Sequence, residues 1–187
     1  MILRKEMSKL EIEKALNGQG DYVQIDNLTR FLKENLPMDM KKFLYARLIE
    51  VYQRRNMFAD AAEICNRLIE ISMTPADRIT CSVKEVEFLI KAGFFDKADL
   101  VMRRIVGDSN AREGQRIESL VKGYYQNQAQ IYEKEKRRNN AIKTYEKILT
   151  LNISNLERGD VEKKLLELYK ELGIMDKFMV LRKKFEK

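Results

Sequence analysis

Residues 125–145 read YQNQAQIYEKEKRRNNAIKTY. Tyr125, Ala129 and Tyr132 stand four and three positions apart, which is the spacing of residues on one face of a helix. The polar residues 134–140 separate this series from a second one that begins at Ala141. Because Asn is common where helices end, we predict a break at residues 138–140 that joins two helices.

The same organisation recurs along the chain. Four further helical segments are followed by breaks that contain Gly or Asn, at residues 17–20, 55–56, 92–93 and 172–173. In each of the five units, a large residue of the first helix precedes a packing residue of the second by nine positions. These pairs are Leu16 and Ile25, Tyr52 and Ala61, Leu89 and Ala98, Tyr132 and Ala141, and Tyr169 and Phe178. The second members are 36, 37, 43 and 37 residues apart, a period typical of repeated helix pairs.

The repeat resembles the tetratricopeptide repeat (TPR) family, in which an aromatic residue, a Leu, a small residue and a Tyr are spaced along the first helix and an Ala opens the packing face of the second. The two best matching units contain Tyr125, Gln128, Ala129, Tyr132, Ala141 and Tyr145, and Tyr45, Leu48, Ile49, Tyr52, Ala61 and Cys65. The resemblance implies an all-α fold, a right-handed α-solenoid of about five helix-turn-helix repeats in one domain, residues 1–187. The approximate repeats are 3–37, 41–74, 76–108, 111–152 and 155–187.

The remaining three units depart from the family pattern. Polar residues stand at usually apolar positions, namely Lys9 and Glu13 in the first unit, Ser82 and Glu85 in the third, and Glu162 and Arg182 in the last, where Phe178 also replaces the usual Ala. Degenerate terminal units suit a solenoid because its end repeats face water. The 43-residue interval leads us to expect one long helix from Ala111 to Arg138.

The composition argues against an enzyme. The 187 residues include no His, which removes the commonest general base and the commonest zinc ligand. Cys65 and Cys81 form no Cys-x-x-Cys motif, and their apolar neighbours favour buried thiols. We therefore expect no cofactor and no metal. The charged N-terminal residues do not suit a signal peptide, and no apolar stretch approaches a membrane span, so we expect a cytoplasmic protein without a membrane partner.

The resemblance implies that first-helix side chains outside the packing positions line a concave binding surface. By register these are Ala46, Glu50, Gln53, Val83, Glu87, Ile90, Gln126, Gln130, Glu133, Lys163, Glu167 and Lys170. Some family members bind the terminal carboxylate of a peptide with Lys and Asn at these inner positions. Here Ala46, Val83 and Gln126 stand at the positions of the Lys, and Glu50 and Glu87 at those of the Asn, so this carboxylate-binding set is not present. Glu50, Glu87, Glu133 and Glu167 favour a neutral or basic partner over an acidic one, although they are equally well explained as solvated carboxylates. We expect a non-enzymatic adaptor or scaffold that binds a protein or peptide.

The net charge of +7 supports an alternative, because residues 111–152 carry 9 basic and 5 acidic residues. An RNA- or DNA-associated repeat protein would use basic residues of the turns, namely Arg54, Arg55, Lys134, Lys136, Arg137 and Arg138. Stabilisation of helix ends explains most of these cations equally well. An accessory subunit of an enzyme complex is a third alternative. Self-association through the last repeat is also open, because that repeat carries the apolar residues Ile174, Met175, Phe178 and Met179.

Overall fold

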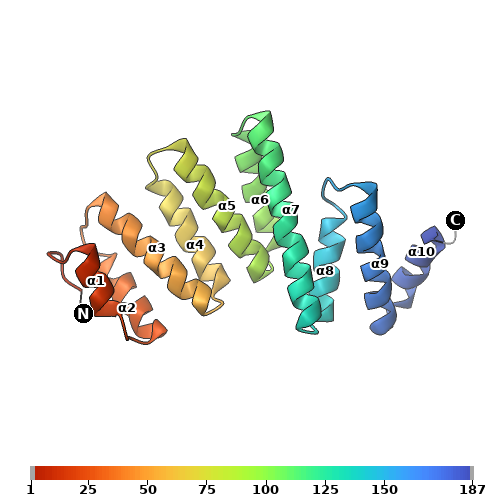
Figure 1. Cartoon of the computed structure of the whole chain (residues 1–187), viewed down its shortest axis with the longest axis horizontal. Helices are drawn as coiled ribbons and strands as arrows, with labels where there is room; N and C mark the ends of the chain where they lie inside the picture. The colour runs from red at the N-terminus through yellow and green to blue at the C-terminus, as the bar shows by residue number, and fades with distance from the viewer. Residues whose placement is uncertain (1–2, 186–187) are drawn as a thin grey trace. The chain divides into compact units, whose positions relative to one another are not determined.

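The computed structural model describes residues 3–185; residues 1–2 and 186–187, which belong to the predicted domain and in part to its last repeat, lie outside the described residues. The described residues form ten α-helices, which confirms the all-α prediction (Figure 1). Their bounds are α1 Lys9–Leu16, α2 Asp21–Phe31, α3 Met38–Arg54, α4 Phe58–Glu70, α5 Pro75–Ala92, α6 Phe95–Gly107, α7 Ala111–Lys134, α8 Arg138–Ile148, α9 Asn155–Glu171 and α10 Met175–Phe185. No helix among residues 3–185 is long and apolar enough to cross a membrane.

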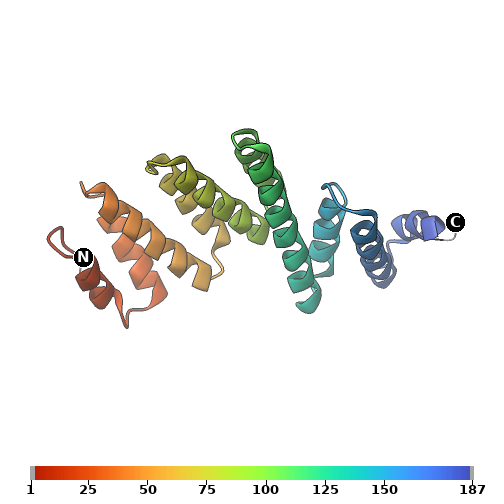
Figure 2. The same cartoon turned by 45° about the horizontal axis from the view of Figure 1, so that its top comes forward.

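The helices fall into two compact units, α1–α6 before residue 109 and α7–α10 after residue 108. Within each unit, the helices pack mainly against their neighbours in the chain. In both views of the second unit, each helix lies beside the next one in sequence (Figure 1 and Figure 2). Such sequential packing is what a chain of helical hairpins produces, because each hairpin buries its apolar face against the next.

Four of the hairpins turn in the same way. Each turn contains one residue with a left-handed backbone, with φ of 56° at Asn56, 81° at Gly93, 57° at Lys136 and 68° at Gly173. The N–H of the following residue donates to the carbonyl oxygen of the residue five positions earlier, for instance Met57 to Tyr52 over 2.9 Å and Arg137 to Tyr132 over 2.8 Å. The other two bonds of this kind join Phe94 to Leu89 over 2.8 Å and Ile174 to Tyr169 over 2.9 Å. This is the Schellman arrangement, which satisfies carbonyl groups left over at a helix C-terminus.

The boundary between α7 and α8 differs from the prediction. We predicted a break at residues 138–140 and a helix from Ala111 to Arg138, but α7 ends at Lys134 and α8 already begins at Arg138. The left-handed residue is Lys136, which stands five positions before Ala141, just as Asn56 stands five before Ala61. The position of the break is therefore set by its distance from the packing Ala. Asn139 and Asn140 do not form the break and lie in the first turn of α8.

The first hairpin does not share this register. α1 begins with a capping box, in which the Ser8 hydroxyl accepts from the N–H of Glu11 and the Glu11 carboxylate accepts from the N–H of Ser8. Asn17 ends α1 with an extended backbone, and Gly18 alone takes a positive φ, 79°. Ile25, the predicted packing residue of this hairpin, is half-buried, whereas Leu28 of the same helix is fully buried.

In three of the other hairpins the predicted packing residue of the second helix lies in the core, whereas Phe178 of the last hairpin is half-buried. Ala61, Ala98 and Ala141 are each at most 1% exposed, which lets the paired helices approach closely. Of the six polar residues that interrupt the pattern, Ser82, Glu85 and Glu162 are buried, Glu13 is half-buried, and Lys9 and Arg182 are exposed. Cys65 is buried, and burial raises the pKa of its thiol to about 12, whereas Cys81 is only half-buried. The expectation of two buried thiols is therefore confirmed for Cys65 and only partly for Cys81.

Candidate partner-binding surface

The second unit has a groove between its two first helices, α7 and α9. It has a volume of about 490 Å³ and contains four of the residues predicted for the concave face. Gln126 and Gln130 contribute one helical turn of α7, and Lys163 and Glu167 contribute one turn of α9. The remaining lining residues are Tyr145, Glu157, Asp160, Val161 and Lys164. We call this feature the α7–α9 groove.

A hydrogen bond holds the α8 side of the groove in place. The Tyr145 hydroxyl donates to Oε2 of Glu133 over 2.7 Å, and Lys164 Nζ lies 3.7 Å from the other oxygen of the same carboxylate. Burial raises the pKa of Tyr145, and the neighbouring Glu133 carboxylate raises it further. Tyr145 is therefore a neutral donor over the physiological range, and Glu133 is committed to contacts within the chain.

The N-terminal end of α9 supplies a fixed negative charge. Glu157 accepts a hydrogen bond from Lys122 Nζ over 2.6 Å, and it also closes a capping box with Ser154. The bond from Lys122 and the bonds from Ser154 lower the pKa of Glu157 to about 2. The groove thus combines the carboxylates of Glu157, Asp160 and Glu167 with the ammonium groups of Lys163 and Lys164, and it presents both signs of charge beside the two Gln amides.

In the first unit the predicted residues are divided between surface and core. Ala46, Glu50 and Gln53 are exposed, Val83 and Glu87 are half-buried, and Ile90 is fully buried. Ile90 is therefore a packing residue in this structure, and its assignment to the concave surface is corrected. Its neighbours explain why: Phe88 and Leu89 are buried beside it, so α5 packs on more than one face.

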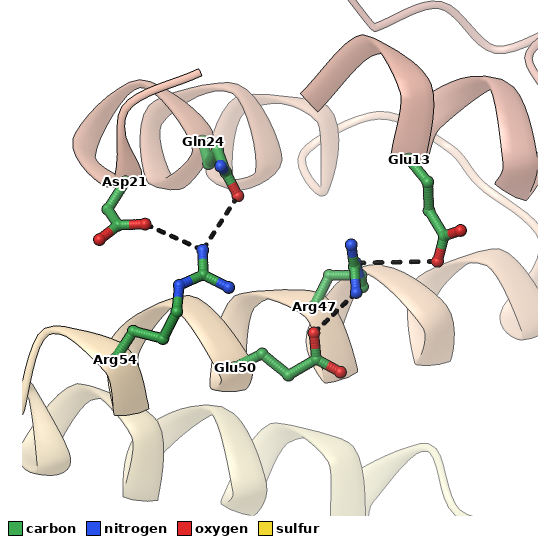
Figure 3. Close-up of polar contacts among 6 residues, drawn as sticks. All are labelled: Glu13, Asp21, Gln24, Arg47, Glu50 and Arg54. Carbon is green, nitrogen blue, oxygen red and sulfur yellow. Dashed lines mark hydrogen bonds and ion pairs between the residues drawn. The ribbon is translucent and has the colours of Figure 1, made fainter. Parts of the chain in front are cut away.

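The carboxylates that were expected to favour a basic partner are mostly occupied. Arg47 Nη1 donates to Glu50 over 2.7 Å, and Nε of the same guanidinium lies 3.9 Å from Glu13 of α1 (Figure 3). Glu87 pairs with Lys91, whose ammonium lies 5.6 Å from the centre of the Phe58 ring. Glu133 accepts the hydrogen bond from Tyr145 and lies beside Lys164. Within residues 3–185, Glu167 alone of the four has no ion pair or hydrogen-bond partner.

Most of the basic residues of the turns also have partners within the chain. Arg54 Nη2 donates to Asp21 over 2.9 Å and to Gln24 over 3.4 Å, which ties α3 to α2 (Figure 3). Arg55 donates to the Tyr22 hydroxyl over 3.0 Å.

The equivalent turn of the second unit behaves in the same way. Arg137 lies over the Tyr132 ring at 4.6 Å and pairs with Glu135, and Arg138 pairs with Glu171 of α9. Lys134 and Lys136 are exposed and have no ion pair within the described part of the chain. The six predicted nucleic-acid contacts therefore include four arginines that already hold helices or turns together.

Sequence reasoning missed five lining residues of the α7–α9 groove: Tyr145, Glu157, Asp160, Val161 and Lys164. Asp160 and Lys164 stand three positions before Lys163 and Glu167, so they continue the same helix face. Extending the predicted register by one row of side chains would have found them. Lys170, which was predicted, is exposed in the last turn of α9 and lies outside the groove.

The last hairpin carries a second hollow of about 310 Å³, whose lining combines apolar residues such as Leu149, Leu165 and Val180 with the charged residues Glu162, Asp176, Lys177 and Lys184. Of the residues proposed for self-association, Met175 and Met179 are exposed, whereas Ile174 and Phe178 are half-buried. Self-association through this repeat stays a prediction.

No family model matches the chain, and no curated protein has a significantly similar sequence. The resemblance to the TPR family therefore stays a prediction. Its support is internal to the chain and consists of the four equivalent turns and the buried Ala residues that follow three of them.

Proposed function

We propose that this chain is a TPR-like right-handed α-solenoid that acts as a cytoplasmic, non-enzymatic adaptor and binds a segment of another protein in the α7–α9 groove. The observation that carries the proposal is the groove itself, which gathers Gln126, Gln130, Lys163 and Glu167 on two helices of successive hairpins. The repeated turn supports the repeat architecture, since its left-handed residues stand 37, 43 and 37 positions apart.

The chemistry of the groove suits an extended or helical peptide of mixed polarity. Each Gln amide both donates and accepts hydrogen bonds, so Gln126 and Gln130 can bind polar groups of a peptide whatever its sequence. Asp160 and Glu167 at the groove favour a neutral or basic segment, while Lys163 and Lys164 prevent a strongly cationic preference. The free carboxylate of Glu167 is the side chain best placed to select a basic residue of the partner.

The test is a site-specific photo-crosslink from the groove. A photoreactive phenylalanine analogue at position 130, introduced in the native host, should crosslink to one protein segment. Mass spectrometry identifies this segment. The corresponding peptide is then synthesised with a fluorescent label. Anisotropy should show that the Q126R/Q130R double variant loses at least about tenfold in affinity for this peptide, because two bulky cations fill the groove. N127R/Q115R is the matched control, since it adds the same charge at exposed positions of α7. Equal affinity of the double variant and the control would refute the proposal.

Fluorescence anisotropy also tests the nucleic-acid alternative. Labelled single- and double-stranded RNA and DNA are titrated with the full chain at low and at near-physiological salt. We expect no saturable binding at physiological salt, because Arg54, Arg55, Arg137 and Arg138 are engaged within the chain. Binding that survives this salt and is abolished by K134E/K136E would replace the adaptor proposal.

A further inference from the structure

The first unit contains a pocket on the side of its second helices. It has a volume of about 490 Å³ and lies between α4 and α6, with α5 contributing Glu85 and Leu89. α4 contributes Ala59, Asp60, Ala62, Glu63 and Asn66, and α6 with its preceding turn contributes Phe94, Lys97, Leu100 and Val101. None of these residues was predicted as a binding residue. We call this feature the Glu85 pocket.

Glu85 is a buried carboxylate whose hydrogen bonding is incomplete. The residue is 7% exposed, and Asn66 Nδ2 donates to its Oε1 over 3.2 Å. Oε2 is buried and has no hydrogen-bond partner among the described residues, and the nearest cation, Arg104 Nη2, is 3.8 Å away. Burial raises the pKa of Glu85, which the bond from Asn66 and the charge of Arg104 only partly offset. A buried acceptor without a donor is unfavourable, so this position invites a further donor.

The fold does not require a carboxylate at this place. Glu85 stands eight residues before the left-handed residue of its turn, and the equivalent residues of the other three hairpins are Leu48, Gln128 and Leu165. All three are buried, and two of them are apolar. Because a Leu fills the position in two hairpins, the helix packing alone does not explain Glu85. A polar group retained at such a cost is typical of a binding site.

The rest of the pocket combines negative charge with apolar walls. Asp60, Glu63 and Glu85 stand against one cation, Lys97, although the chain as a whole has a net charge of +7. Glu63 is closely paired with Arg67, whereas among the described residues the only cation near Glu85 is Arg104 at 3.8 Å. Asp60 and Glu85 are therefore the pocket carboxylates least engaged by cations of the chain. Phe94 and Leu100 are 44% and 63% exposed, so the walls offer apolar surface at the protein boundary. Such a site suits a ligand with an aliphatic stem and a cationic head.

The ammonium group of Lys97 lies over the ring of Phe94 in this pocket. Lys97 Nζ lies 5.2 Å from the centre of the Phe94 ring, within the range of a cation–π contact. The ring of Phe94, which is 44% exposed and lines the pocket, is therefore able to bind a cation, and a ligand would compete with Lys97 for it. A guanidinium fits such a place better than an ammonium, because it is planar, stacks on aromatic rings and is more weakly hydrated.

We propose that the Glu85 pocket binds the side chain of an arginine that a protein partner presents. The guanidinium donates to the Glu85 and Asp60 carboxylates, its plane lies on Phe94, and its methylene groups pack on Leu89 and Leu100. This site is separate from the α7–α9 groove, and the inference does not depend on the function proposed there.

The test uses small probes, so no partner needs to be known. The ¹⁵N-labelled full chain is titrated with N-acetyl-L-arginine amide and, in parallel, with N-acetyl-L-citrulline amide, which has nearly the same shape but no charge. We expect saturable shifts of the Asn66 side-chain amide and of backbone amides around the pocket with the arginine probe only. E85Q and D60N should each weaken binding about fivefold to tenfold, because each removes a charge-assisted hydrogen bond. K97Q should strengthen binding, because it removes a competing cation.

Two controls keep the result specific. E162Q changes another buried carboxylate outside the pocket, and Q126R/Q130R changes the α7–α9 groove; both should leave the affinity for the arginine probe unchanged. The dispersion of the amide spectrum checks that every variant is folded, and D60N serves if E85Q is not. Equal binding of the two probes, affinity unchanged in the folded E85Q and D60N variants, or no saturable shift with arginine would each overturn the proposal.

Discussion

Leu48 and Glu85 occupy the same position of two successive hairpins, and both are buried, at 1% and 7% exposure. In one hairpin the position is filled by an apolar side chain, and in the next by a carboxylate whose Oε2 has no hydrogen-bond donor among residues 3–185. Replacing a poorly compensated buried charge by an apolar side chain of similar volume is often stabilising. Stability therefore favours an apolar side chain at this position, whereas the proposed arginine site requires the carboxylate of Glu85.

E85L should raise the free energy of unfolding by about 1–3 kcal/mol, because it removes a desolvated carboxylate and supplies the side chain that two other hairpins use. The reciprocal change L48E should lower stability by about 3 kcal/mol or more, since it buries a charge that has no prepared partner. Urea unfolding followed by circular dichroism measures both. A less stable E85L would show that Asn66 and Arg104 compensate the Glu85 carboxylate fully.

The left-handed residues of the turns make a second prediction. Asn56 and Lys136 adopt a backbone conformation that Gly adopts without strain, so N56G and K136G should each stabilise the chain by about 0.5–1 kcal/mol. G93A should destabilise by about 1 kcal/mol for the same reason. A Cβ at Gly93 would meet no atom within 4 Å, so the loss would come from the backbone and not from a clash. Thermal unfolding of the three variants checks the signs, and a stabilising G93A would contradict the assigned turn.

The sequence predicted the hairpins better than the binding surface. Breaks at Asn56 and Gly93 were predictable because Asn and Gly favour a left-handed backbone, whereas Lys136 has no such preference and takes it because its spacing to Ala141 is set by packing. Ile90 was misassigned because helical register alone does not show how many faces of a helix its neighbours cover. The pairing of Arg54 with Asp21 joins residues 33 positions apart on two different helices, and no local sequence pattern specifies such a contact.

The hydrogen bond between Tyr145 and Glu133 predicts a measurable contribution to stability. Y145F should lower the free energy of unfolding by about 1–2 kcal/mol, because the bond goes to a charged acceptor and Tyr145 is 5% exposed. E133Q should cost less, since an amide oxygen still accepts from the hydroxyl. The double variant shows whether the two effects are coupled, and strictly additive effects would mean that the bond does not contribute.

The lowered pKa of Glu157 predicts how stability depends on pH. The carboxyl titrates at about 2 in the folded chain and at its ordinary value of 4.5 when unfolded, so the folded state binds the proton less well. Its contribution is therefore complete above pH 4.5 and is lost as the pH falls from there through about 2. E157Q should be less stable than the wild type near neutrality, and the difference should disappear in acid. Urea unfolding across this pH range measures it, with E118Q as the control because Glu118 is an exposed residue of α7 with the same charge. A difference between E157Q and the wild type that persists unchanged in acid would show that Gln disturbs the capping box itself, and that the ion pair with Lys122 is not the source of the stability.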